Sequence, residues 1–186
     1  MSRRQFRADD PERRTWQDPE EIFGMIGLGP GMVFGDMGCG DGYFALPAAR
    51  KVGNRRRVYA VDIDADAIAR LCQQAEREGL KNIVARSGEA EIAVPCEGCA
   101  DLVFFGITLH DFCDPGQVIR NARITLKPSG HLADLDWMDQ PMEFGPPLQK
   151  RFSIEKARRM IESGGFGILS VRDAGPYHYL ILGGRS

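Results

Sequence analysis

Two aspartates on either side of a glycine-rich turn are the residues of this chain whose types and spacing most clearly indicate chemistry. Asp36 follows a short apolar segment at residues 32–34, and three glycines then alternate over residues 38–42. Such glycines let the backbone turn sharply and let a ligand approach it closely. About 20 residues further on, a second apolar segment ends at Asp62, where a carboxylate can meet the ribose hydroxyls of a nucleotide. The ordered set predicts a nucleotide-binding turn.

The spacing of the glycines also indicates which kind of nucleotide would bind. A dinucleotide fingerprint has a further glycine three residues after the second one, which helps to seat a pyrophosphate on a helix N-terminus. Tyr43 occupies that position here, and Asp36 and Asp41 would lie close to the pyrophosphate. Because carboxylates repel a pyrophosphate, the turn favours a ligand that carries positive charge.

The segment DMGCGDG at residues 36–42 resembles the first motif of the class I S-adenosylmethionine (SAM)-dependent methyltransferases. The resemblance implies that Asp36 and the backbone of residues 38–42 hold the methionine end of SAM and that Asp62 grips the ribose. It also implies that Glu89 accepts a hydrogen bond from the adenine amino group and that S-adenosylhomocysteine (SAH) is the product. The cofactor-binding residues expected on this ground are Asp36, Gly38, Cys39, Gly40, Gly42, Asp62, Ile63, Gly88, Glu89, Ala90 and Gly106.

The remaining apolar segments continue the resemblance, with strands alternating with helices. We predict strands at residues 32–34, 57–61, 82–85, 100–106 and 130–137, helices at 19–25, 43–50, 114–126 and 153–163, and a final hairpin at 166–173 and 178–182. The alternation predicts an α/β fold with a doubly wound, mostly parallel seven-stranded sheet and helices on both faces. The C-terminal hairpin would add one antiparallel strand.

Length and charge bound the organisation of the chain. Its 186 residues fit one domain, expected over residues 19–186 behind a leader at residues 1–18. Acidic residues are interleaved with the arginines of this leader, which we expect to be mobile or loosely docked; they are Arg3, Arg4, Arg7, Arg13 and Arg14. The net charge of −2 argues against a nucleic-acid surface. No apolar segment approaches the roughly 20 residues that span a membrane, and no signal-peptide pattern is present, which predicts a cytoplasmic protein.

Cysteines are the other residues that could hold a metal or react. Five of them in a chain without a secretory signal indicate a reducing compartment. Cys96 and Cys99 form a single CxxC with no second pair to complete a zinc site, so we expect two free thiols in a surface loop and no metal. Cys72 is expected to lie in a helix core.

Candidate catalytic residues follow from the rule that ligands of open parallel sheets bind outside the carboxyl ends of the strands. The strand at 100–106 leads to His110 and Asp111, and the hairpin turn brings His178 to the same edge. Each can act as a base or orient a nucleophile. Structural roles stay open beside these: His110 as a lining residue, Asp111 as the cap of the helix that begins near Pro115, and His178 as an ordinary hairpin residue.

Four further residues are candidates for the acceptor pocket. Trp137 ends the strand at 130–137, and the loop that follows contains a stiff double proline at residues 146–147 before Arg151. Tyr177 belongs to the hairpin turn. Trp16 precedes the first helix, where it either covers the cofactor or plugs the helix base.

The chain also resembles, in the pattern HDFCDP…LKPSGHLADLDW…GPP, the small prokaryotic methyltransferases grouped with those of quinone biosynthesis and other small molecules. The resemblance implies methyl transfer from SAM to a small-molecule acceptor whose identity it does not carry. The Asn-Pro-Pro-Tyr type of tetrapeptide found in nucleic-acid and glutamine methyltransferases is replaced by GITL at residues 106–109. Three alternatives stay open: a nicotinamide-dependent oxidoreductase, a SAM-binding regulator without catalysis, and a metalloid or thiol methyltransferase.

Overall fold

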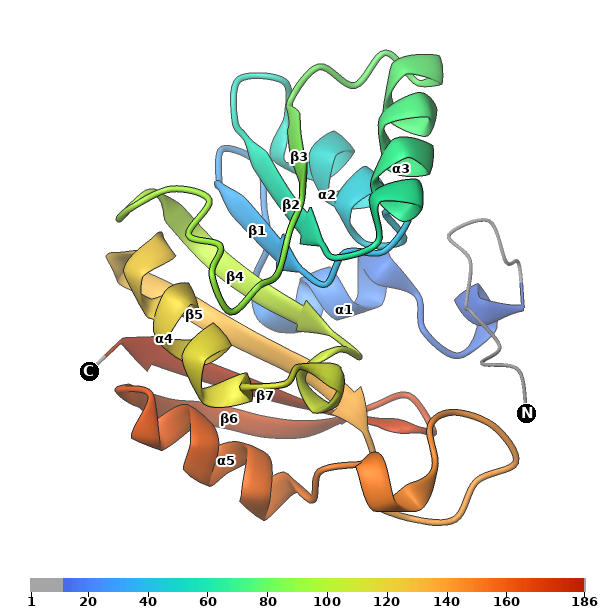
Figure 1. The fold of residues 1–186 in the computed structure, drawn as a ribbon, viewed down its shortest axis with the longest axis vertical. Helices are drawn as coiled ribbons and strands as arrows, with labels where there is room; N and C mark the ends of the chain where they lie inside the picture. The colour runs from blue at the N-terminus through green and yellow to red at the C-terminus, as the bar shows by residue number, and fades with distance from the viewer. Residues whose placement is uncertain (1–11, 186) are drawn as a thin grey trace.

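A seven-stranded sheet with the order β3-β2-β1-β4-β5-β7-β6 forms the middle layer of the computed structural model, which describes residues 12–185 (Figure 1). Strand β7 runs antiparallel to both of its neighbours, and the other neighbouring pairs are parallel. The predicted α/β fold with an antiparallel C-terminal strand is therefore confirmed. The strands are β1 (Phe34–Met37), β2 (Val58–Asp62), β3 (Ile83–Ser87), β4 (Ala100–Gly106), β5 (Leu126–Trp137), β6 (Phe166–Ala174) and β7 (His178–Arg185).

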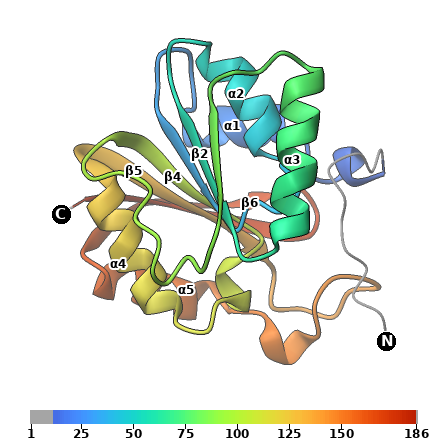
Figure 2. The same cartoon turned by 45° about the horizontal axis from the view of Figure 1, so that its top comes forward.

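Helices cover both faces of this sheet. Figures 1 and 2 show α1, α2 and α3 over one face and α4 and α5 over the other. The helices are α1 (Pro19–Ile26), α2 (Ala45–Val52), α3 (Ala65–Arg77), α4 (Pro115–Thr125) and α5 (Ile154–Ser163), with the short 3-10 turns η1 (Arg13–Thr15), η2 (Leu109–Asp111) and η3 (Leu148–Lys150). Consecutive residues of a strand point to opposite faces, so Phe104 packs on the α1–α3 side and Phe105 on the α4–α5 side.

Side-chain caps fix where the helices begin. Asp18, Asp64, Asp114 and Ser153 each accept a hydrogen bond from a backbone N–H of the first turn of the helix that follows. Pro follows the cap directly in α1 and α4, where its missing N–H costs nothing. Because Asp114 is the cap of α4, the alternative that Asp111 caps this helix is wrong.

Helix α3 corrects one expectation about the cysteines. Its buried face consists of Ala67, Ile68, Leu71 and Ala75, whereas Cys72 is exposed. One residue turns the helix by about 100°, so Cys72 points away from the sheet that Leu71 contacts. The prediction that Cys72 lies in the core was therefore wrong.

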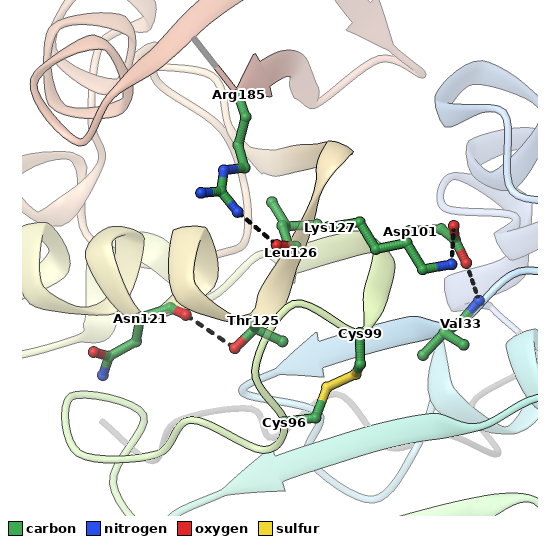
Figure 3. The surroundings of a disulfide bond; sticks show 9 residues. All are labelled: Val33, Cys96, Cys99, Asp101, Asn121, Thr125, Leu126, Lys127 and Arg185. Atoms are coloured by element: carbon green, nitrogen blue, oxygen red, sulfur yellow. Dashed lines mark hydrogen bonds and ion pairs between the residues drawn. A yellow bond between two sulfur atoms is a disulfide. The ribbon is translucent and has the colours of Figure 1, made fainter.

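The CxxC segment lies in the loop between β3 and β4, and its two cysteines form a disulfide (Figure 3). Their Cα atoms are 5.9 Å apart, a usual spacing for a disulfide. The backbone N–H groups of Gly98 and Cys99 donate to the carbonyls of Ile124 and Thr125 at the end of α4. The prediction of two free thiols at positions 96 and 99 was therefore wrong, and two of the five cysteines no longer support a reducing compartment.

Candidate cofactor and acceptor site

The glycine turn after β1 lies at the carboxyl edge of the sheet. Gly38, Gly40 and Gly42 all have positive φ angles, of 80°, 54° and 94°. A Cβ atom on Gly38 would lie 2.8 Å from Thr108, and one on Gly42 would collide with Leu71. A Cβ atom on Gly40 would meet no protein atom within 4 Å. Packing therefore requires two of the glycines, while the third faces open space at the edge where ligands of such sheets bind.

Asp62 is fixed beside this turn by backbone hydrogen bonds. The N–H of Gly40 donates to its Oδ2 at 2.7 Å, and the N–H of Asp64 donates to its Oδ1 at 2.9 Å. The adjacent Ile63 is 70% exposed, which is unusual for a large apolar side chain. Gly88 donates its N–H to the Asp62 carbonyl at 2.9 Å, which brings residues 88–90 to the same edge. The structure thus places Asp62 and Ile63 beside the predicted adenine segment, where Glu89 is exposed and Ala90 is buried.

Asp36 is a buried carboxylate with an unsatisfied oxygen. It is 1% exposed, and its Oδ2 atom has no hydrogen-bond partner among the described residues. Burial and the nearby charge of Asp62 raise the pKa of Asp36 to about 7, although Arg13 and a hydrogen bond from the N–H of Ala45 oppose this rise. A buried polar atom without a partner is rare in native proteins, and a ligand group or an ordered water at this position would explain it. A ligand cation at this position would satisfy the oxygen and restore the negative charge.

Cys39 and Gly106 complete the surroundings of the turn without offering a polar group to a ligand. Cys39 is buried, and burial, with the charges of Asp36 and Asp62, raises the pKa of its thiol. A Cβ atom on Gly106 would lie 2.7 Å from Phe104 and 2.8 Å from Phe44, so this glycine is required by packing.

The segment before α1 packs against the glycine turn. Arg13 is 5% exposed, its Cζ lies 3.5 Å from the centroid of the Tyr43 ring, and its Nε donates to Gln17 Oε1 at 2.8 Å. The Tyr43 hydroxyl donates to the Gln17 carbonyl. The expectation of a loosely docked leader is therefore wrong for Arg13, whereas Arg14 is exposed. Arg3, Arg4 and Arg7 lie outside the described residues, and the boundary between residues 18 and 19 stays a prediction.

His110 forms a buried pair with Asp136 at the carboxyl ends of β4 and β5. Its Nδ1 lies 2.7 Å from Asp136 Oδ1, and the two side chains are 2% and 1% exposed. Its Nε2 lies 3.5 Å from Asp111 Oδ2, and Lys150 Nζ lies 3.4 Å from the other oxygen of Asp111. Burial alone would lower the pKa of His110, but the hydrogen bond and charge of Asp136, together with the charge of Asp111, raise it.

Asp136 is a site residue to which the sequence analysis assigned no role. The available signal was two acidic residues at alternate positions, 134 and 136, in an otherwise apolar strand. Both lie on the face of the sheet that α4 and α5 cover. Both carboxylate oxygens of Asp134 lack partners among the described residues, and burial, with the charge of Asp136, raises its pKa well above the usual range.

An aromatic cluster lies at the same edge but on the α1 side of the sheet. It consists of Trp16, Trp137, Phe144, Tyr177 and His178. The rings of Trp16 and His178 are stacked, 5.6 Å apart and 16° from parallel, and the ring of Trp137 lies 4.4 Å from His178. Phe144 and Tyr177 meet at 4.7 Å. Trp137 and His178 are buried, whereas Trp16 and Tyr177 are partly exposed, so the cluster has an inner and an outer layer.

His178 is uncharged in this setting. Burial and the positive charges of Arg13 and Arg151 lower its pKa to about 3, while the polar backbone of Ala174 opposes this shift. Within residues 12–185, no group forms a hydrogen bond of normal geometry with either ring nitrogen. His178 therefore presents a neutral imidazole to the cluster.

Arg151 holds the loop that follows β5. Its guanidinium donates to the carbonyls of Met138, Gln140, Phe144 and Pro146, at distances from 2.8 to 3.3 Å. Its Cζ lies 5.8 Å from the Trp137 ring. These contacts fasten the double-proline loop against the aromatic cluster.

No helix among residues 12–185 is long and apolar enough to cross a membrane. The same residues contain no group of three or more His, Cys, Asp and Glu side chains arranged to hold a metal ion.

Comparison with known proteins identifies relatives of this chain. A family model described as "Methyltransferase domain" matches residues 28–144. The crystal structure of a SAM-dependent methyltransferase from Aquifex aeolicus has a TM-score of 0.91 at 25% identity, covering 98% of this chain and 100% of that one.

Two curated relatives carry named activities. The 2-phytyl-1,4-naphtoquinone methyltransferase of Trichormus variabilis is 28% identical over 127 residues, which are 68% of this chain and 55% of the relative. The nocamycin O-methyltransferase of Saccharothrix syringae is 33% identical over 113 residues, 60% of this chain and 40% of the relative. The chain thus spans about half the length of the curated relatives it matches.

The site fits the cosubstrate of this family. The unsatisfied Asp36 oxygen suits an ammonium group, and the open space over Gly40 adjoins the residue whose N–H fixes the carboxylate of Asp62. Because the family model covers more than half of its length and the fold agrees, the chain belongs to the class I SAM-dependent methyltransferases.

Proposed function

We propose that this methyltransferase acts on a small-molecule acceptor that binds at the aromatic cluster, next to the methionine end of SAM. The observation that carries the proposal is the neutral, unpartnered His178 inside a cluster of aromatic rings at the carboxyl edge of the sheet. Pockets for small ligands are mostly apolar and aromatic, with a few polar groups that set orientation. The relatives named above as methyltransferases of a naphthoquinone and of nocamycin agree with a small acceptor.

The charge of Arg13 supports a cluster that adjoins the cofactor site. This charge opposes the rise in the pKa of Asp36 and contributes to the fall in the pKa of His178. The guanidinium therefore acts on both groups at once. Trp16, two residues before the α1 cap Asp18, supplies the outer layer of the cluster from the same segment. An acceptor that Trp16 covers at the His178 ring would therefore lie beside the cofactor.

Bound SAM supplies a methyl group on a positively charged sulfur, and the chain must align a nucleophile with it and keep water away. Such transfer depends mainly on proximity and orientation. We assign to His178 the role of accepting a hydrogen bond from a hydroxyl or similar group of the acceptor. The aromatic rings of Trp137 and Tyr177 would exclude water, and Arg151 would shape the pocket by holding its loop.

His110 is proposed as the group that takes up a proton from the acceptor. Asp136 accepts from Nδ1–H and so leaves Nε2 as the nitrogen that can bind a proton. Asp111 lies beside Nε2 and is itself paired with Lys150, and the two would set the charge environment of this nitrogen. A cytoplasmic location stays a prediction from the sequence.

Trp16 provides the test of the acceptor pocket, because it is partly exposed and its truncation leaves the inner layer in place. We expect Trp16→Ala to lower kcat/KM for the acceptor at least tenfold, since it removes the ring that covers His178. The measurement is SAH release in a screen of small aromatic and hydroxylated acceptors, followed by steady-state kinetics on the best one. The affinity for SAH should stay within about threefold of the wild type.

Trp16→Phe is the matched control, because it keeps a ring on His178 and should retain most of the turnover. Equal kcat/KM for the wild type and Trp16→Ala would place the acceptor elsewhere. SAH binding without transfer to any acceptor of the screen would instead favour the SAM-binding regulator without catalysis.

A further inference from the structure

Arg13 is a buried cation that reaches the cofactor site from outside the glycine motif. It belongs to the turn η1, and its guanidinium carbon Cζ lies over the Tyr43 ring, 3.5 Å from the ring centroid. Tyr43 directly follows the last glycine of the turn. The hydrogen bond from Nε to Gln17 Oε1 fixes one edge of the guanidinium, while the hydroxyl of Tyr43 fastens the same segment at the Gln17 carbonyl.

The position of Arg13 relative to Asp36 matters for what it can bind. Among residues 12–185, Arg13 supplies positive charge that acts on the Asp36 carboxyl, while Asp62 adds to the negative charge. Asp36 lies in β1 just before the glycine turn, and its Oδ2 has no hydrogen-bond partner among the described residues. The carboxyl of Asp36 in β1 and the guanidinium of Arg13, which contacts Tyr43 at the end of the glycine turn, therefore act on each other across this turn.

The methionine end of SAM is a zwitterion, with an ammonium and a carboxylate on one carbon. Asp36 can pair only with the ammonium. The carboxylate would otherwise lie among Asp36, Asp41 and Asp62, where its burial without a cation would be costly. A guanidinium offers a planar fork of donors that matches a carboxylate.

We propose that Arg13 binds the carboxylate of the methionine moiety of SAM, so that one residue from the segment before α1 is part of the cofactor site. This inference rests on the binding of SAM at the glycine turn. It adds a residue outside the family motif to the site and ties the cofactor to Trp16, three residues further along the chain.

Decarboxylated SAM keeps the ammonium and lacks the carboxylate. It therefore distinguishes binding of the carboxylate by Arg13 from a purely structural role of this residue. Calorimetry on the wild-type chain should show at least tenfold tighter binding of SAM than of decarboxylated SAM. In Arg13→Gln, the affinity for SAM should fall at least tenfold, and the two ligands should bind within about twofold of each other. Decarboxylated SAM should bind the wild type and Arg13→Gln alike, because it has no group for Arg13 to hold.

Arg14→Gln is the matched control, since Arg14 is the exposed neighbour in the same turn, and it should keep the preference of the wild type. Circular dichroism and thermal melting check that each variant is folded. An unchanged preference for SAM in Arg13→Gln overturns the inference. Equal weakening of both ligands also overturns it, because Arg13 would then act only by docking its segment. A wild type that binds neither ligand overturns the cofactor site itself and this inference with it.

Discussion

Replacing Gly40 with Val is expected to abolish SAM binding while the fold stays intact. The added side chain would enter the open space over the turn, beside Asp62, where no protein atom lies within 4 Å of a Cβ atom. The Val side chain would occupy space that bound SAM needs. We therefore expect a loss of at least a hundredfold in affinity, about 3 kcal/mol. Titration calorimetry with SAM and SAH measures the loss.

The backbone at Gly40 adds a second cost that needs a control. Its φ of 54° strains any residue with a side chain by roughly 1–2 kcal/mol. Gly79 has a φ of 68° and likewise faces open space, but it follows α3 and precedes β3, away from the carboxyl edge. Gly79→Val should therefore melt at about the same temperature as Gly40→Val and still bind SAM. Normal binding by Gly40→Val would mean that the turn is only structural.

Trp137→Ala should cause the largest loss of stability in the acceptor region. The side chain is 1% exposed and contacts His178, Phe144 and Trp16. Truncating a fully buried Trp leaves a large cavity and costs about 3–5 kcal/mol. For a chain of this size, the expected fall in melting temperature is about 10 °C. Urea unfolding of the variant measures the free energy directly.

Because of this loss of stability, Trp137→Ala is a poor probe of turnover. Lower activity in this variant could come from unfolding as well as from weaker acceptor binding. Trp137→Phe keeps a ring beside His178 and should cost less than half as much. A change of under about 1 kcal/mol in Trp137→Ala would show that the aromatic cluster is not a packed unit.

Most of the fold could be predicted because its signals are local. The strand at residues 100–106 is a continuous apolar segment, and the structure has β4 with the same bounds. The glycine turn and Asp62 are also readable from types and spacing alone, since the backbone needs glycine at fixed positions. Helix α3 received no predicted range, although Asp64 marks its start.

The parts of the site that escaped prediction depend on contacts between distant residues. Arg13 docks on Tyr43, and His110 pairs with Asp136, which lie 30 and 26 positions away along the chain. No local pattern distinguishes Arg13 from the other arginines of its segment or states that Asp136 faces His110. The disulfide was missed for a different reason, because composition suggested free thiols and only the turn geometry brings the two sulfurs together.

The central claim is that the ammonium of SAM meets the carboxylate of Asp36, and its most direct test is the pH dependence of SAM binding. The pKa of Asp36 is about 7 in the free chain, so the carboxyl is mostly protonated at pH 6 and must release a proton to pair with the ammonium. The raised pKa also means that this group favours the folded state at low pH, and that this contribution is lost as the pH rises from about 4 through 7.

Calorimetry with SAM at pH 6 and pH 7.5 should show binding about five- to tenfold tighter at the higher pH, with proton uptake by the buffer. Asp36→Asn, which cannot ionise, should bind SAM more weakly at both pH values and with no such dependence. Binding of SAM that is equally tight at pH 6 and 7.5 in the wild type, or unchanged in Asp36→Asn, would contradict the account.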